Sequence, residues 1–174
     1  MPLARSAVAS LTLLALATLA RGASAGSCTP DFAPVERELN AARARWTASR
    51  TTVYNFRLAR TCLCDARLAG PFRVRVEDGA IRAAIYQGAA EGGIPDGTRV
   101  GEADLANVYT IDQMFNLVAA AIAKKVCSVQ VSYDAVLGHP TKIDIDFDKE
   151  TADEELRLTV SDVRTAAAFT KPAR

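Results

Sequence analysis

Apolar side chains recur at helical spacing in a first stretch of the chain. Residues 35–49 contain neither glycine nor proline, and Leu39, Ala42 and Trp46 fall on one face of a helix with 3.6 residues per turn. We interpret Trp46 as an anchor of the core, because large aromatic side chains contribute most to core burial. The pattern predicts a first helix with one buried side.

A second helix is expected from Ile111 to Lys125, where apolar residues such as Phe115 again repeat every three to four positions. Its start is marked by Thr110 and Gln113, which have the spacing of a capping box. Its last turn contains two lysines, which suit the negative end of the helix dipole.

Six other stretches alternate apolar and polar side chains, which is the period of a β-strand. They are residues 53–60, 72–77, 80–86, 126–133, 142–147 and 156–163. Asp78 and Gly79 separate the second stretch from the third, and an Asp-Gly pair between alternating runs is a strong signal for a hairpin.

The predicted order is one helix and three strands, a long loop, then one helix and three strands. This order is typical of an α+β fold, in which a mainly antiparallel sheet carries both helices on one face, and it hints at two tandem α-β-β-β units. The opposite face is expected to meet solvent with the polar residues of the strands: Arg73, Arg75, Glu77, Lys142, Asp144 and Asp146.

The first 25 residues have the order of a secretory signal peptide. Arg5 ends a charged start, residues 6–20 are uncharged, and Ala23-Ser24-Ala25 is a cleavage motif. The uncharged stretch is shorter than the roughly 20 residues that a membrane-spanning helix needs, so no transmembrane span is expected in the mature chain. The sequence therefore predicts an exported protein, periplasmic or secreted.

Cys28 offers an alternative, since a bacterial lipoprotein signal ends in small residues before a cysteine that receives lipid. Arg21 and Gly22 interrupt the apolar run, and Ala25 stands where a large aliphatic residue is usual, so a released chain is favoured over lipid anchoring. The expected mature protein is a single domain over residues 26–174. Its core covers about 35–163, with a flexible loop at about 88–109 and a short loose tail.

The charge of the mature chain argues against nucleic acid as a partner. Loss of Arg5 and Arg21 reduces the 21 basic residues to 19, against 20 acidic residues, which leaves a net charge of −1. Binding to nucleic acid usually requires a basic face.

The four cysteines, Cys28, Cys62, Cys64 and Cys127, all lie in the mature chain. An even number in an exported protein is typical of disulfides, and the Cys62-Leu63-Cys64 spacing does not fit a zinc site. If the first strand runs back beneath the first helix, its far end returns to the start of the domain. We therefore expect Cys28 to pair with Cys62 or Cys64, and Cys127 with the remaining one.

Catalytic constellations are hard to assemble from this sequence. His139 is the sole histidine and lies between Gly138 and Pro140, so it offers little support for a serine or cysteine triad. No Gly-x-Ser-x-Gly elbow and no phosphate-binding loop is present. We expect no enzyme activity, no catalytic residue and no cofactor.

An acidic stretch has the spacing of a calcium loop: Asp144, Asp146, Asp148 and Glu155 fall at positions one, three, five and twelve. Lys149 occupies the sixth position, where such a loop needs glycine. We therefore interpret the stretch as the solvated face of a strand that runs into an acidic turn, with a weak calcium site as the alternative.

Several short motifs together resemble an exported bacterial family known as domain of unknown function 6174. The similarity covers about residues 46–163 and rests on Tyr54-Asn55-Phe56, Cys62-Leu63-Cys64, Val74-Arg75-Val76-Glu77-Asp78-Gly79, Thr110-Ile111-Asp112, Val131-Ser132-Tyr133-Asp134 and Gly138-His139-Pro140-Thr141. The resemblance implies secretion and the element order given above, and it brings no catalytic residue.

These observations favour a non-enzymatic protein of the cell envelope or the exterior that binds another protein or a peptide through its sheet or its long loop. The alternative is a small-molecule or calcium-binding module built on the acidic stretch from Asp144 to Glu155, with the glycine-rich residues 88–101 as a lid.

Overall fold

The computed structural model describes residues 28, 30–62, 64–88, 93–151 and 154–165. The predicted signal peptide, the C-terminal tail after residue 165 and Asp153 lie outside the described residues. No helix within the described part of the chain is long and apolar enough to cross a membrane.

Two main helices and six strands make up the domain, in the predicted order. Helix α1 covers Ala33–Ala48 and α4 covers Ile111–Lys124. The strands are β1 Val53–Thr61, β2 Phe72–Glu77, β3 Ala80–Tyr86, β4 Ser128–Tyr133, β5 Pro140–Asp146 and β6 Leu156–Thr165. Two short helices, α2 at Ala66–Ala69 and α3 at Glu102–Leu105, have no counterpart in the sequence prediction, because four residues are too few to show a helical period.

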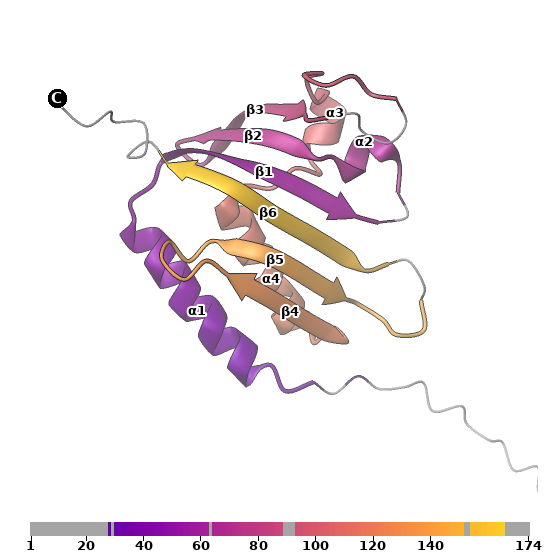
Figure 1. Cartoon of the computed structure of the whole chain (residues 1–174). Coiled ribbons are helices and arrows are strands. Elements are labelled where there is room, and N and C mark those ends of the chain that lie inside the picture. Colours follow the sequence, from indigo (N-terminus) through magenta and orange to yellow (C-terminus); the bar gives the residue numbers. More distant parts are fainter. Residues whose placement is uncertain (1–27, 29, 63, 89–92, 152–153, 166–174) are drawn as a thin grey trace, which may run out of the picture.

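The six strands form one antiparallel sheet in the order β3-β2-β1-β6-β5-β4. Each half is a three-strand meander that follows one main helix, and the halves meet where β1 pairs with β6. This arrangement confirms the α+β prediction and the tandem α-β-β-β order. In Figure 1 the sheet lies in front and α4 passes behind β5 and β6.

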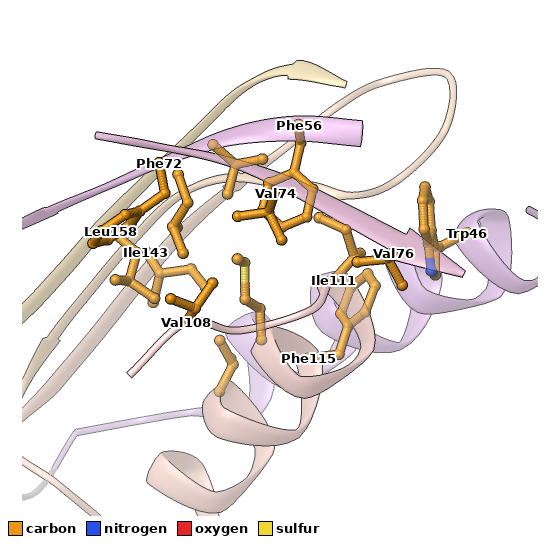
Figure 2. Packing of buried hydrophobic residues seen from close by; sticks show 14 of the residues in the cluster. Trp46, Phe56, Phe72, Val74, Val76, Val108, Ile111, Phe115, Ile143 and Leu158 are labelled. Carbon is orange, nitrogen blue, oxygen red and sulfur yellow. The ribbon is translucent and has the colours of Figure 1, made fainter. Parts of the chain in front are cut away.

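The core lies between the sheet and the helices. Alternate residues of each strand point into it, for example Tyr54, Phe56 and Leu58 of β1, while α4 contributes Ile111 and Phe115, all at most 1% exposed. Figure 2 shows Phe56 of β1 on one side of the layer and Ile111 and Phe115 of α4 on the other. Trp46 of α1 is also buried and meets the Tyr54 ring edge-on, with 5.1 Å between ring centroids, as its interpretation as a core anchor requires.

Part of the segment that the sequence predicts as a flexible loop over 88–109 pairs with β3. The Tyr86 N–H donates to the Thr98 carbonyl at 2.8 Å, the Val100 N–H donates to the Ala84 carbonyl at 2.9 Å, and Val100 is buried. Backbone groups on an edge strand need partners, and residues 97–100 supply them to β3. Residues 89–92 lie outside the described part of the chain.

Candidate functional site

The predicted cysteine pairing is wrong. Cys28 pairs with Cys127, which directly precedes β4, and Cys62 pairs with Cys64 after the end of β1. The error came from the assumption that β1 runs beneath α1. Helix α1 instead packs against α4 and β4, and β6 and β5 separate β1 from β4, so the far end of β1 lies away from Cys28.

The two disulfides constrain very different lengths of chain. Cys28 and Cys127 are 99 positions apart, whereas Cys62 and Cys64 are two apart. In the loop-entropy model, closing about 100 residues stabilises a fold by about 4.7 kcal/mol, and closing three residues by about 1.6 kcal/mol. The Cys28–Cys127 bridge is therefore the one expected to hold the domain together. Such bridges are consistent with a protein from an oxidising compartment outside the cytoplasm.

The candidate calcium ligands are spread along a strand and a turn. Asp144 and Asp146 lie on β5, and Asp144 forms an ion pair with Arg157 of β6 at 3.2 Å. Asp148 follows the strand and accepts the N–H of Glu150 at 3.0 Å, while its own N–H donates to the Glu154 carboxylate. Glu155 directly precedes β6. No three side chains of the types that bind metals converge among the described residues.

His139 lies at the end of the turn between β4 and β5 and contacts residues at both ends of that turn. Its Nδ1 lies 3.1 Å from the Pro140 carbonyl oxygen, which can only accept, so Nδ1 carries the proton. Nε2 then faces the Asp134 carboxylate at 4.0 Å, and the ring is buried edge-on against Trp46. Backbone N–H groups, first that of Leu137, hold the pKa of Asp134 below its usual value. This arrangement is a structural cluster, closed to solvent at the histidine.

A groove on the helix side of the sheet was not foreseen from the sequence. It has a volume of about 620 Å³ and lies between α4, the turn before β3 and the segment after α3, with Ile81, Tyr109 and Leu117 among its lining residues. None of the described residues that line it is charged. The sequence gives no signal for this groove, because it forms where segments distant in the chain fail to fill the helix layer completely.

The sheet face opposite the helices carries the polar side chains of the strands. Figure 1 shows this face without a helix in front of it. We call it the open face. The residues expected there, among them Arg73, Arg75 and Lys142, alternate in sequence with buried neighbours such as Val74 and are half-buried or exposed themselves. The prediction of a polar outer face is therefore confirmed at these positions.

Two arginines lie directly opposite each other on the open face. Arg57 of β1 is in register with Arg73 of β2, and we call these two residues the arginine pair. Arg73 donates to the side-chain oxygen of Gln87 at 3.1 Å. Within the described part of the chain, no carboxylate lies within ion-pair distance of either member. Two like charges in register destabilise a sheet unless a counter-charge is supplied.

The surroundings of the arginine pair suit an anionic group. Ser161 of β6 is in register with Arg57 on the other side of β1 and is exposed, so a residue with a hydroxyl group neighbours Arg57 on the open face. Arg75 is the next residue of β2 on the same face as Arg73, and it forms an ion pair with Glu77 at 2.6 Å. Among the open-face arginines of β1 and β2, the uncompensated charges are therefore those of Arg57 and Arg73. The alternation places both residues on the open face, but their register depends on which strands become neighbours.

Comparison with known proteins identifies one family. The model of a family of unknown function (DUF6174) matches residues 38–165, which is most of the chain. No curated protein matches the sequence.

Proposed function

This chain belongs to DUF6174, a family of unknown function, and we propose that it is a non-enzymatic exported protein that binds an acidic segment of another protein or peptide. The binding surface is the open face, and the arginine pair is its centre. The observation that carries the proposal is the juxtaposition of Arg57 and Arg73 without a carboxylate partner among the described residues.

The chemistry of the pair favours a carboxylate as its ligand. A guanidinium presents a planar set of N–H donors that matches a carboxylate in a bidentate arrangement, and two neighbouring guanidinium groups can hold one or two such groups. A docked acidic side chain would also relieve the repulsion between the two arginines. The repulsion between the two arginines in the free protein therefore favours binding, because the bound carboxylate removes it.

The architecture supports a docking role for the open face. The strands that carry the arginine pair are central, since β1 lies between β2 and β6, and the core packs against their other side. The pair is thus displayed on a rigid support, which reduces the ordering that binding requires. The acidic residues Asp144 and Asp146 lie two strands away from β1, on β5, and form no ion pair with the arginine pair.

The proposed location is outside the cytoplasm, with a released mature chain that begins after residue 25. Cys28 supports release over lipid anchoring, because its sulfur is bonded to Cys127 and a lipidated cysteine has no sulfur available for a disulfide. Intact-mass measurement of the protein from its native envelope tests this point. A mass increased by acyl chains would contradict it.

The binding proposal is tested by photo-crosslinking in the native envelope. A crosslinking amino acid at Ser161, beside Arg57, is expected to capture a protein, whereas the same group at Ala44, exposed on α1, is expected to capture none. The product at position 161 should disappear in an Arg57→Glu/Arg73→Glu variant. It should persist in Arg37→Glu/Arg45→Glu, which changes the net charge equally at exposed positions of α1.

A second measurement uses a purified probe, a peptide of consecutive glutamates. Titration at low salt should show binding to the mature chain that weakens as salt rises, because exposed charges are screened. The open-face double variant should lose this binding and the α1 double variant should retain it. Equal loss in both variants, or crosslinking at position 161 that is indifferent to Arg57 and Arg73, would rule out the arginine pair as the binding centre.

A further inference from the structure

The open face carries an apolar strip beside the arginine pair. Ala83 and Ile85 of β3 alternate with Ala84 and Tyr86, which are buried in the core, so the side chains of the first two point to the open face. Both are half-buried, and neither belongs to the described apolar residues that form the core or pack against it. We call Ala83 and Ile85 the β3 strip.

The strand register places the β3 strip next to the arginines of β2. Ile85 is directly opposite Arg73, and Ala83 is directly opposite Arg75. Directly opposite residues have Cβ atoms about 4.5–5.5 Å apart. The Arg73 guanidinium also donates to Gln87, which directly follows β3, so its charge lies toward the strand that carries the strip.

A row of residues in register crosses four neighbouring strands, which Figure 1 shows side by side: Ser161 of β6, Arg57 of β1, Arg73 of β2 and Ile85 of β3. Within two positions of this row, Asp162 is the one carboxylate among the described residues, and no ion pair joins it to either arginine. Arg75 is matched by Glu77, while Arg164, in register with Asn55, adds a further positive charge. The row is therefore positive at its centre and apolar at its β3 end.

The distance between strands determines the spacing that suits an extended ligand. Neighbouring strands lie about 4.8 Å apart, so Ile85 is about 7 Å from the midpoint between Arg57 and Arg73. Side chains on one side of an extended peptide are two residues, or about 6.6 Å, apart. When a peptide crosses the sheet with an acidic residue over the arginine pair, the residue two positions away therefore lies over Ile85. The residue one position away points away from the sheet.

We propose that the open face selects an extended segment of another protein or peptide in which an apolar residue stands two positions from an acidic residue. The acidic residue binds the arginine pair, and the apolar residue packs on Ile85. This inference rests on the proposed function and names the sequence pattern that the same surface prefers. Charge alone accepts any acidic segment, whereas the apolar contact adds affinity only at the correct spacing.

The spacing is tested with peptides of equal length, blocked at both ends and titrated into the wild-type mature chain by NMR. Their cores are Glu-Ser-Glu-Ser-Leu, with leucine on the side of the glutamates, Glu-Ser-Glu-Leu-Ser, with leucine on the opposite side, and Glu-Ser-Glu-Ser-Ser. An extended chain can cross the sheet in either direction, so each core is also made in reverse order. In at least one direction the first core should bind about fivefold more tightly than the second, as partial burial of a leucine side chain predicts. The second should bind like the third.

Variants locate the apolar contact. Ile85→Thr should abolish the difference between the first and second peptides and leave binding of the leucine-free peptide unchanged, because threonine keeps a β-branched side chain in the strand but offers less apolar surface. Val136→Thr is the matched control, since Val136 is 81% exposed in the turn between β4 and β5, and it should preserve the difference. Intermolecular NOEs should join the leucine methyl groups to Ile85.

Failure of this inference and failure of the proposed function give different results. Equal affinity of the three peptides, lost in Arg57→Glu/Arg73→Glu, would overturn the spacing and leave the proposed function standing. Binding that is indifferent to this double variant, or no binding of any peptide, would overturn both. NOEs from leucine to the groove residues Ile81 or Leu117, in place of Ile85, would overturn the role of the β3 strip. The comparison of peptides uses the wild-type chain and does not depend on whether a variant folds.

Discussion

The surroundings of Gly138 leave no space for a side chain. Its φ is +83°, in the left-handed region, and the turn between β4 and β5 presses it against the middle of α1. A Cβ at this position would overlap the Ala42 carbonyl oxygen and lie 2.9 Å from Cβ of Arg45. Backbone conformation and space therefore both require glycine here.

Gly138→Ala is expected to lower the free energy of unfolding by about 3 kcal/mol or more, because the strained backbone and the overlap with α1 add together. Gly79→Ala is the matched control. Gly79 has a similar φ of +76° with no atom within 4 Å of the added Cβ, so about 1 kcal/mol is expected. Urea denaturation measures both values, and equal losses would show that contact with α1 does not matter.

Tyr54 has two roles, one for its ring and one for its hydroxyl. Its ring is buried, and burial raises the pKa of its hydroxyl to about 12. The hydroxyl accepts the N–H of Ile111 at 3.2 Å, which is one of the otherwise unpaired donors at the start of α4. A strand pattern predicts the burial of Tyr54, but the partner of its hydroxyl lies 57 positions away in the chain.

At the scale of elements, the start of α4 is the best specified helix end. The Thr110 hydroxyl accepts the Gln113 N–H at 3.2 Å, and the Gln113 side chain accepts the Thr110 N–H at 2.8 Å. This reciprocal capping box confirms the prediction made from the two residue types and their spacing. By contrast, α1 begins without a side-chain bond from its N-cap residue, Phe32.

Thr110→Ala is expected to cost about 1 kcal/mol of unfolding free energy, because it leaves a helix donor without its acceptor in a buried position. Thr110→Ser keeps the hydroxyl and should recover most of that loss. Chemical denaturation of the three proteins gives the comparison. If serine were as damaging as alanine, packing of the threonine methyl group would matter more than the cap.

The two sheet edges show how elements distant in sequence complete each other. Residues 97–100 pair with β3 and cover one edge, while α1 packs beside β4 at the other. Covering of edges limits unwanted pairing with other chains. Neither partner could be assigned from local patterns, because the glycine-rich segment has the composition of a loop and an amphipathic helix can pack on either half of a sheet.

At the scale of the whole molecule, the Cys28–Cys127 bridge ties the start of the domain to its second half. It fixes the lead before α1 to the residue that enters β4. Because the bridge spans 99 positions, it limits the unfolded chain strongly, and it adds a covalent link next to an edge strand that pairs with β5 alone.

Removal of this bridge in Cys28→Ser/Cys127→Ser should lower the unfolding free energy by about 2–5 kcal/mol. Thermal unfolding with and without a reductant is the measurement, and a reductant should affect the variant less than the wild-type protein. Unchanged stability would mean that the second half of the sheet is held by packing alone.

Periodicity and residue type were enough to determine the two main helices and the six strands. The helical repeats around Trp46 and Phe115, the alternation in the strands, the Asp78-Gly79 turn and the Thr110 cap all depend on neighbours within a few positions. The fold class followed from their order, because a helix before three short-looped strands leaves few ways to bury one face of each.

Tertiary structure alone decided which elements became neighbours. The strand order β3-β2-β1-β6-β5-β4 sets the Arg57–Arg73 register, and the position of α1 beside β4 brings Cys28 to Cys127. The same alternating pattern is compatible with several strand orders, and an apolar helix face fits any of them. The strand order depends on how closely the whole core packs and on the entropy lost when long loops close. Neither quantity can be read from a short segment of the sequence.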